Sequence, residues 1–239
     1  MSSDSDAILH EPPVAGGEVD TLLGSLERQR RTFTAAQLTI VPANQASWAD
    51  LQAIFGAADY PGKCCCQHFK TRDCDWAARS ILERRESLRG QTRCDDPSAR
   101  ATTGLVAYLG GERPGGEPVG WVAVEPRTAY PRLARVRTVW SGRQEDKADD
   151  SVWAVTCFVT RKGYRRRGIT YALAAATVDY ARRNGARALE AYPMITQPGK
   201  EIPWGEVHVG ARQVFEEAGF AEVSHPTLRR VVMRIDFVS

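Results

Sequence analysis

Apolar residues in the second half of the chain follow two alternating patterns, continuous runs and helical spacing. Seven of the ten residues in Ser151–Thr160 are apolar, which predicts a central strand buried on both faces. In Ile169–Asn184 the apolar residues recur every three or four positions, which predicts a helix ended by the glycine that follows. The same patterns predict three further elements, a strand over Ala186–Tyr192, a helix over roughly His208–Ala218 and a closing strand over Leu228–Ile235.

The first half predicts a hairpin with elements before it. Gly104–Leu109 and Val119–Glu125 are apolar runs joined by a segment rich in glycine and proline, which is typical of two strands and their turn. Earlier patterns predict a strand over Gln37–Val41 and helices over Asn44–Phe55 and Asp75–Arg89. A hairpin followed by strand, helix, strand, helix and strand predicts a mixed α/β (α+β) domain.

The N-terminal segment differs from the rest of the chain. Residues 1–36 lack sustained periodicity, so we expect a tail that is partly disordered or forms a short helix, followed by one domain over residues 37–239. No apolar run approaches the roughly eighteen residues of a membrane-spanning helix. The polar, acidic start is unlike a secretory signal, so we expect a cytoplasmic protein with no membrane partner.

The charge balance is nearly neutral. The formal net charge of +3 is too small to predict a nucleic-acid partner. Arginine outnumbers lysine, which is typical of a GC-rich bacterial coding sequence.

The cysteines raise the question of a metal. In a reducing compartment we expect free thiols. Three adjacent cysteines with His68 nearby suggest zinc, but neighbouring residues cannot easily converge on one tetrahedral ion, and no second Cys-x-x-Cys pair exists. We therefore predict no metal site for the six cysteines, Cys64, Cys65, Cys66, Cys74, Cys94 and Cys157.

The segment Thr160–Thr170 carries the clearest chemistry. It joins the buried strand to the first turn of a helix, where unpaired amides and the helix dipole favour an anion. Gly168 allows the backbone to approach a phosphate closely, and three arginines add positive charge. A solvated basic turn is the alternative. Nucleic-acid binding is disfavoured because no aromatic residues are interleaved with these arginines.

Arg165-x-x-Gly168-x-Thr170 resembles the Arg/Gln-x-x-Gly-x-Gly/Ala signature of GNAT N-acetyltransferases, with Thr170 in place of the usual Gly or Ala. Ala186–Tyr192 resembles the family's next strand, and Ala211–Phe220 resembles its last helix ending in Gly-Phe. The resemblance covers roughly Gly104–Asp236. It implies a mixed, mostly antiparallel sheet of about six or seven strands flanked by helices.

The resemblance implies acetyl-CoA as the cofactor. The pantetheine arm would lie beside the end of the buried strand, and a backbone amide there would polarise the thioester carbonyl. The pyrophosphate would bind the amides and arginines of the loop. The expected cofactor-binding residues are Phe158, Val159, Thr160, Arg165, Arg166, Arg167, Gly168, Ile169 and Thr170.

The resemblance leaves the catalytic acid and base open. Many family members have a tyrosine that protonates the leaving thiolate where this chain has Phe215. His208 and Tyr192 are the candidate replacements, and Glu190, which shares a strand face with Tyr192, is a candidate base. The alternative for His208 is a helix-start residue with a local hydrogen bond, and the alternative for Tyr192 is an aromatic residue at the core edge.

The resemblance implies transfer of an acetyl group from acetyl-CoA to a primary amine by direct attack in a ternary complex. The acceptor would be a small molecule or a peptide, and a homodimer is left open. The alternative, kept open by Phe215, is a non-catalytic acyl-CoA-binding sensor or partner-binding module. A second set of residues could flank the acceptor: Trp140, Glu201, Trp204 and Glu206. Its two acidic members would favour a cationic amine. The alternative is that all four are ordinary surface residues.

Overall fold

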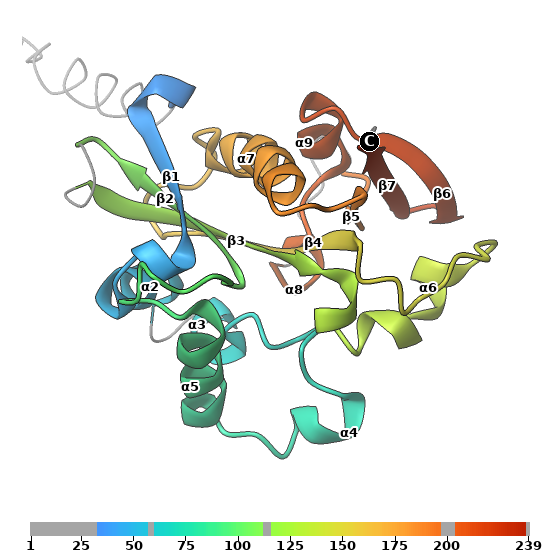
Figure 1. Ribbon diagram of the computed structural model, residues 1–239, viewed down its shortest axis with the longest axis horizontal. Helices are drawn as coiled ribbons and strands as arrows, with labels where there is room; N and C mark the ends of the chain where they lie inside the picture. Colours follow the sequence, from blue (N-terminus) through green and yellow to red (C-terminus); the bar gives the residue numbers. More distant parts are fainter. Residues whose placement is uncertain (1–32, 57–59, 112–115, 197–203, 238–239) are drawn as a thin grey trace, which may run out of the picture. The chain divides into compact units, whose positions relative to one another are not determined.

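A seven-stranded sheet organises the protein. The computed structural model describes residues 33–56, 60–111, 116–196 and 204–237, and its strands are arranged in the order β1-β2-β3-β4-β5-β7-β6 (Figure 1). The β4–β5 pairing is parallel, and the other five pairings of described strands are antiparallel. The predicted fold class is confirmed. The strands are β1 (Leu38–Pro42), β2 (Gly104–Leu109), β3 (Glu117–Pro126), β4 (Val152–Thr160), β5 (Ala188–Ala191), β6 (Ala221–Thr227) and β7 (Arg230–Asp236).

Helices cover both faces of the sheet (Figure 1). Because successive strand residues point to opposite faces, β3 contributes Val122 to the core beneath α7 and Trp121 to the core beneath α2. The described α-helices are α2 (Trp48–Phe55), α3 (Tyr60–Cys64), α4 (Asp73–Trp76), α5 (Ile81–Thr92), α6 (Arg137–Trp140), α7 (Ile169–Arg183), α8 (Trp204–Val207) and α9 (Arg212–Glu217). Four short 3-10 turns accompany them, η1 (Ala35–Gln37), η2 (Ala43–Gln45), η3 (Arg127–Ala129) and η4 (Leu133–Arg135).

Helix α7 lies directly on β3 because Gly120 leaves room for it. A Cβ atom at Gly120 would lie 2.6 Å from Ile169 Cγ2 and 3.1 Å from Leu173 Cδ1. Both of these helix side chains are almost fully buried. The close contact fixes the first turn of α7 against the sheet, beside the end of β4.

Three predicted helices differ from the structure. The helix expected from Asn44 begins four residues later, at Trp48, where Ser47 and Asp50 form a capping box. The helix expected over Asp75–Arg89 is instead α4 and α5, because Ser80 and Glu83 form a capping box that starts a new helix. The helix expected from His208 begins four residues later, at Arg212. Strand β6 was not predicted, since its sequence is polar and contains a proline, which an edge strand tolerates.

Strands β4 and β5 separate after a short parallel pairing. They pair from Val152 to Val155 on β4, and a β-bulge follows in the β3–β4 register. Beyond that point the segment before α9 takes the place beside β4, because the Phe158 amide donates to the His208 carbonyl over 2.7 Å. The same segment continues alongside Met194, whose amide donates to the Gly210 carbonyl over 3.0 Å.

The cysteines that the structure describes are free thiols, as expected. A hydrogen bond with Cys66 and burial raise the pKa of Cys157 well above its usual value, so this thiol is a poor nucleophile. Among the described residues, no group of three or more His, Cys, Asp or Glu side chains is placed to hold a metal ion. The Cys74 side chain and the predicted tail before Phe33 lie outside the described residues.

None of the described helices is both long and apolar enough to cross a bilayer.

Candidate functional site

The loop between β4 and α7 has the backbone of an anion site. Gly163, Arg166 and Gly168 adopt left-handed φ angles of 93°, 61° and 82°. Left-handed residues interspersed with right-handed ones turn successive amides toward a common concavity, which suits phosphate oxygens. Arg166 is the unusual member, since a side chain at positive φ is strained. The local sequence therefore holds a backbone shape that favours a ligand with negative charge.

Helix α7 adds amides and a dipole to this loop. Gly168 is its N-cap residue and supplies no side-chain cap. The Tyr171 and Ala172 amides both donate to the Gly168 carbonyl, over 3.0 and 3.4 Å. Helix geometry leaves the amides of Ile169 and Thr170 without an intrahelical acceptor, at the positive end of a fifteen-residue helix. Phosphate groups bind readily at such a helix start.

The arginines of the loop differ in their surroundings. Arg161 pairs with Glu117 over 3.0 Å. Arg167 stacks on Phe33, with its guanidinium carbon 3.9 Å from the ring centroid, and its carbonyl accepts the Phe33 amide over 2.9 Å. Arg165 Nε donates to the Thr160 carbonyl over 3.4 Å. The positive charges are thus held around the loop while Arg166 stays exposed.

The backbone amides at the end of β4 face two opposite edges of the strand. The Val159 amide faces β3, as does that of Arg161, which donates to the Val119 carbonyl over 2.9 Å. Amides alternate along a strand, so those of Phe158 and Thr160 face the opposite edge. The Phe158 amide is bonded to the His208 carbonyl. The Thr160 amide lies closer to the loop, where the strand edge and the helix start meet.

A pocket of about 280 Å³ lies beside this segment. Its lining brings together parts of the chain that are far apart in sequence, and we call it the His208 pocket. The lining includes His208 and Tyr192, both predicted as candidates, and also side chains from the region before α4, from the β3–β4 connection and from β7. The residues that define it here are His68, Phe69, Arg132, Tyr192, His208 and Arg230.

His208 is held in a defined orientation. Its imidazole is 8% exposed and contacts His68, with 5.5 Å between ring centroids. Nδ1 lies 3.0 Å from the Gly205 carbonyl. Because a carbonyl only accepts, Nδ1 carries the proton in this contact, and a neutral ring then presents Nε2 as its acceptor. The geometry thus suits neutral His208 for accepting a proton, and protonated His208 for donating one.

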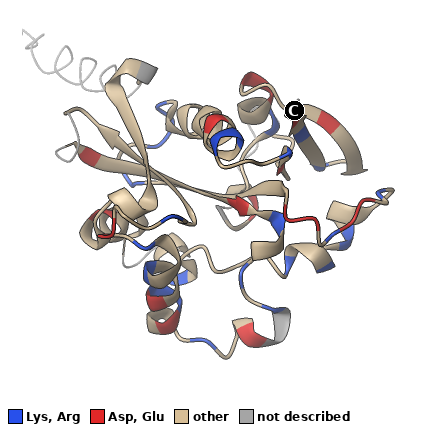
Figure 2. Ribbon diagram, in the orientation of Figure 1, with Lys and Arg blue, Asp and Glu red and all other residues tan. Residues whose placement is uncertain are grey.

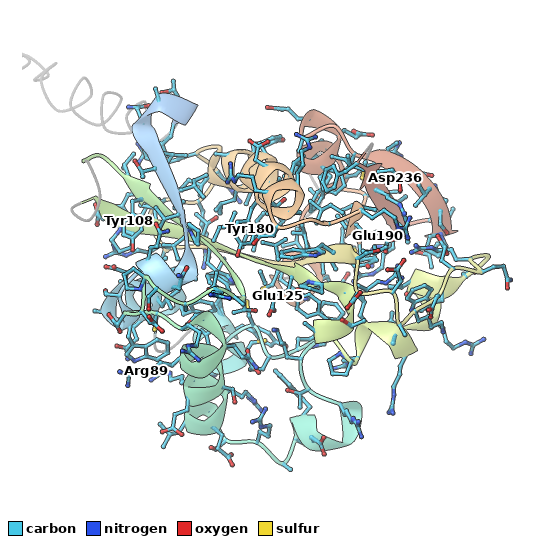
Figure 3. The ribbon with its side chains drawn as sticks, viewed as in Figure 1. Arg89, Tyr108, Glu125, Tyr180, Glu190 and Asp236 are labelled. Carbon is cyan, nitrogen blue, oxygen red and sulfur yellow. The ribbon has the colours of Figure 1, made fainter. Side chains whose placement is uncertain are left out.

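Glu190, which is labelled in Figure 3, lies with Tyr192 in a buried ionic cluster. The Tyr192 hydroxyl donates to Glu190 Oε2 over 2.9 Å. Burial and the Glu190 carboxylate raise the pKa of Tyr192 well above its usual value. Glu190 itself is fully buried and bonds three guanidinium groups, Arg127 at 3.3 Å, Arg234 at 3.1 Å and Arg143. Glu190 is thus separated from the pocket that Tyr192 lines.

Phe215 belongs to the core. It is fully buried against Phe158 and Phe220, with ring centroids 5.7 and 5.1 Å away. Gly210 keeps this contact open, since a Cβ atom there would lie 2.7 Å from the Phe215 ring. The phenyl ring therefore fills space and supplies no proton.

Two members of the second set of residues from the sequence, Trp140 and Glu206, do not line the pocket. Trp140 is buried, and its indole N–H donates to the Leu133 carbonyl over 2.9 Å. Glu206 pairs with Arg229 over 2.6 Å. Glu201 and the Trp204 side chain lie outside the described residues.

Comparison with protein families decides the classification. Residues 71–198, more than half of the chain, match the model of the acetyltransferase (GNAT) family. The chain belongs to the GNAT acetyltransferase family. The fold of this family supports acyl transfer from acetyl-CoA in general, and the described loop and helix start fit the phosphates of that cofactor.

Solved structures of GNAT proteins are similar in fold. They include a GCN5-related N-acetyltransferase from Kribbella flavida, at 18% identity and a TM-score of 0.46 over 85% of this chain and 100% of that one. An N-acetyltransferase from Staphylococcus aureus Mu50 aligns at 12% identity and a TM-score of 0.45, over 83% and 98%. An acetyltransferase of the GNAT family from Streptococcus pneumoniae aligns at 16% and 0.43, over 84% and 99%. No curated protein sequence matches the chain.

Sequence reasoning missed part of the pocket of this GNAT protein. Arg132 and Arg230 carry no motif and come from the β3–β4 connection and the start of β7. His68 was considered only as a metal ligand with the cysteines. The tertiary fold places these three residues in the pocket, and no local sequence pattern predicts that position.

Proposed function

We propose that this GNAT family member is an acyl-CoA-dependent N-acetyltransferase that moves an acetyl group from acetyl-CoA to a primary amine within a ternary complex. The observation that carries the proposal is the left-handed loop that ends in the uncapped start of α7. Its amides have the direction and the electrostatic surroundings that a pyrophosphate needs.

Acetyl-CoA, when bound, supplies the acetyl group as a thioester. The amides of Ile169 and Thr170 would hold its pyrophosphate, and exposed Arg166 would add charge. The outward amide of Thr160 would orient the arm along β4. A fixed orientation of both reactants accounts for much of the acceleration expected of such a site.

The protein must also take a proton from the acceptor amine, because an ammonium group cannot attack the thioester. In its neutral form, His208 would accept the proton of the amine at Nε2, a buried atom of this pocket residue, since Nδ1–H is bonded to Gly205. The protonated ring would then return a proton to the leaving sulfur. Tyr192 is the rival donor, but its proton is already bonded to Glu190 and its raised pKa makes it a weaker acid.

A second candidate function is a non-catalytic acyl-CoA-binding module. Two observations favour it: Phe215 stands where the family commonly has a tyrosine acid, and the Phe158 amide is bonded within the protein. Both candidates require CoA binding at the same loop. They differ in turnover and in the role of His208.

The experiment compares the wild type with Gly168→Glu and Gly142→Glu. Both glycines have left-handed φ angles, 82° and 73°, so both changes add strain and a negative charge. We expect Gly168→Glu to weaken CoA binding at least about tenfold in calorimetry, because the carboxylate would lie among the phosphates. Gly142, with nothing within 4 Å of a Cβ atom, controls for strain and should leave the Kd unchanged.

Turnover separates the two candidates. Thiol release from acetyl-CoA would be followed over a panel of primary amines, with the wild type and His208→Ala. Acetyl transfer that His208→Ala lowers supports the enzyme, and tight CoA binding without turnover supports the binding module. A folded Gly168→Glu protein with wild-type CoA affinity would contradict both.

A further inference from the structure

Arg230 is a cation with no carboxylate in ion-pair contact among the described residues. It begins β7, lines the His208 pocket and is partly buried. Its neighbours on the same strand and turn are paired, Arg229 with Glu206 over 2.6 Å and Arg234 with Asp236 and Glu190. Among the described residues, the Arg230 guanidinium forms no ion pair and no side-chain hydrogen bond, and Glu206 acts on it only as a nearby charge.

A guanidinium without an ion pair is unusual in such a partly buried position. Burial lowers the pKa of Arg230, which means that its surroundings disfavour the charged form. A partly buried guanidinium normally has a carboxylate or phosphate partner, because desolvation otherwise costs free energy. A bound anion would supply the missing partner.

The rest of the lining reinforces the positive charge. Arg132 also faces the pocket, with Nη1 3.4 Å from His68 Nδ1. No Asp or Glu is among the described residues that line the pocket, although acidic and basic positions are interspersed over the elements (Figure 2). Glu206, the acidic residue that the sequence analysis considered, has its carboxylate bonded to Arg229. The pocket therefore does not favour a purely cationic ligand.

The remaining walls limit the size and character of the ligand. They are largely apolar, including Phe69, Val139 and Val231. The volume of about 280 Å³ is close to the lower end of small-molecule pockets, which suits a small metabolite. His208 lines the same pocket as the two arginines.

We propose that the acceptor is a small amine with an apolar body and an anionic group, such as a carboxylate, which Arg230 binds. This inference rests on the proposed acetyltransferase function and names its substrate class. A guanidinium can bind a carboxylate or a phosphonate through two parallel hydrogen bonds, so either anion fits the geometry. The proposal adds an anionic group to the cationic amine that Glu201 and Glu206 favour in the sequence.

The test uses matched amines that differ only in the anion. One set is L-phenylalanine, its phosphonate analogue, L-phenylalaninamide and phenethylamine, and a second is 5-aminopentanoate with pentylamine. The enzymes are the wild type, Arg230→Gln and the control Arg229→Gln, whose arginine is exposed and paired with Glu206. We expect the wild type to prefer the anionic members by at least about tenfold in kcat/KM. Arg230→Gln should lose that preference through KM, while Arg229→Gln should retain it.

A binding measurement keeps the inference independent of turnover. Calorimetry with CoA present would compare N-acetyl-L-phenylalanine with N-acetyl-L-phenylalaninamide on the same three proteins. If no amine is acetylated, but the wild type binds the acid more tightly than the amide and Arg230→Gln abolishes that preference, the enzyme proposal fails and the anion site stands. Equal use and equal binding of acid and amide by the wild type, or an unchanged preference in Arg230→Gln, would overturn the inference.

Discussion

At the scale of single residues, Glu190 shows how many donors one buried carboxylate can gather. Its oxygens accept hydrogen bonds from Tyr192 and from three arginines, and its side chain is fully buried. The strand pattern alone predicted that Glu190 and Tyr192 share a face. The arginines come from the β3–β4 connection and from β7, so their approach follows from the fold. These contacts suit an anchor for the strands around the pocket.

Glu190→Gln should destabilise the protein strongly. The amide would leave three guanidinium groups in or near the core without their carboxylate, a loss on the order of 3 kcal/mol or more. Urea unfolding followed by circular dichroism measures the change. The control is Glu216→Gln, which removes an exposed pair with Arg212 and should cost less than about 1 kcal/mol. Similar losses in the two variants would show that the buried cluster contributes no special stability.

At the scale of elements, the position of the loop between β4 and α7 depends on how closely α7 approaches the sheet. The contact between Gly120 on β3 and Ile169 on α7 sets that approach, since a Cβ atom at Gly120 would lie 2.6 Å from the isoleucine. Ile169 is also the first residue of the helix and follows Gly168. Packing at one residue of β3 is therefore coupled to the placement of the loop amides.

Gly120→Ala should destabilise the protein by about 1–3 kcal/mol, because the added methyl group must push α7 from the sheet. It should also weaken CoA binding. Gly90→Ala is the matched control, since Gly90 is exposed within α5 and has nothing within 4 Å of a Cβ atom. That change should stabilise α5 by roughly 0.5–1 kcal/mol. Thermal unfolding of both variants measures the sign, and a stabilised Gly120→Ala protein would contradict the packing argument.

Elements with strong local patterns were predictable from sequence. The run in β4 and the helical spacing in α7 each have their own signal, and both are confirmed within one or two residues. Residues 208–211 were misassigned to a helix because their backbone bonds to β4 and to Met194. Tertiary hydrogen bonds of this kind outweigh local helix propensity.

The residues of the candidate site also differ in whether the sequence alone could predict them. The loop at Gly168 has a local signature of strand, glycine and helix start, so the sequence was enough to predict its place between β4 and α7. Its role in cofactor binding stays a prediction. His208 was found through its place in the resemblance to the family. Arg132 and Arg230 are ordinary arginines in sequence, and only the packing of β7 against the β3–β4 connection brings both to one pocket. Their role in acceptor binding stays a prediction.

At the scale of the described domain, the sheet is shared between cores on its two faces. Strands β3 and β4 contribute buried side chains to both, Val122 and Phe158 on one face, Trp121 and Cys157 on the other. Strand β6 is the opposite case, an edge strand with mostly exposed residues. The two regions should therefore differ in local stability.

Hydrogen exchange should show this difference directly. Amides of β3 and β4 should exchange only through global unfolding, whereas those of β6 should exchange through local opening at a lower free energy. Mass spectrometry of peptides over a time course measures both. Equal protection of β6 and β4 would mean that the edge strand unfolds only together with the rest of the sheet.

The hydrogen bond between the Phe158 amide and the His208 carbonyl has a consequence for affinity. A ligand that takes the Phe158 amide swaps one acceptor for another, so it gains little from that contact. The displaced carbonyl belongs to His208, whose residue also lines the pocket. Binding of a ligand at the β4 edge would then change the affinity of the His208 pocket for its own ligand. By thermodynamic linkage, a ligand in the pocket would change the affinity at the β4 edge by the same factor.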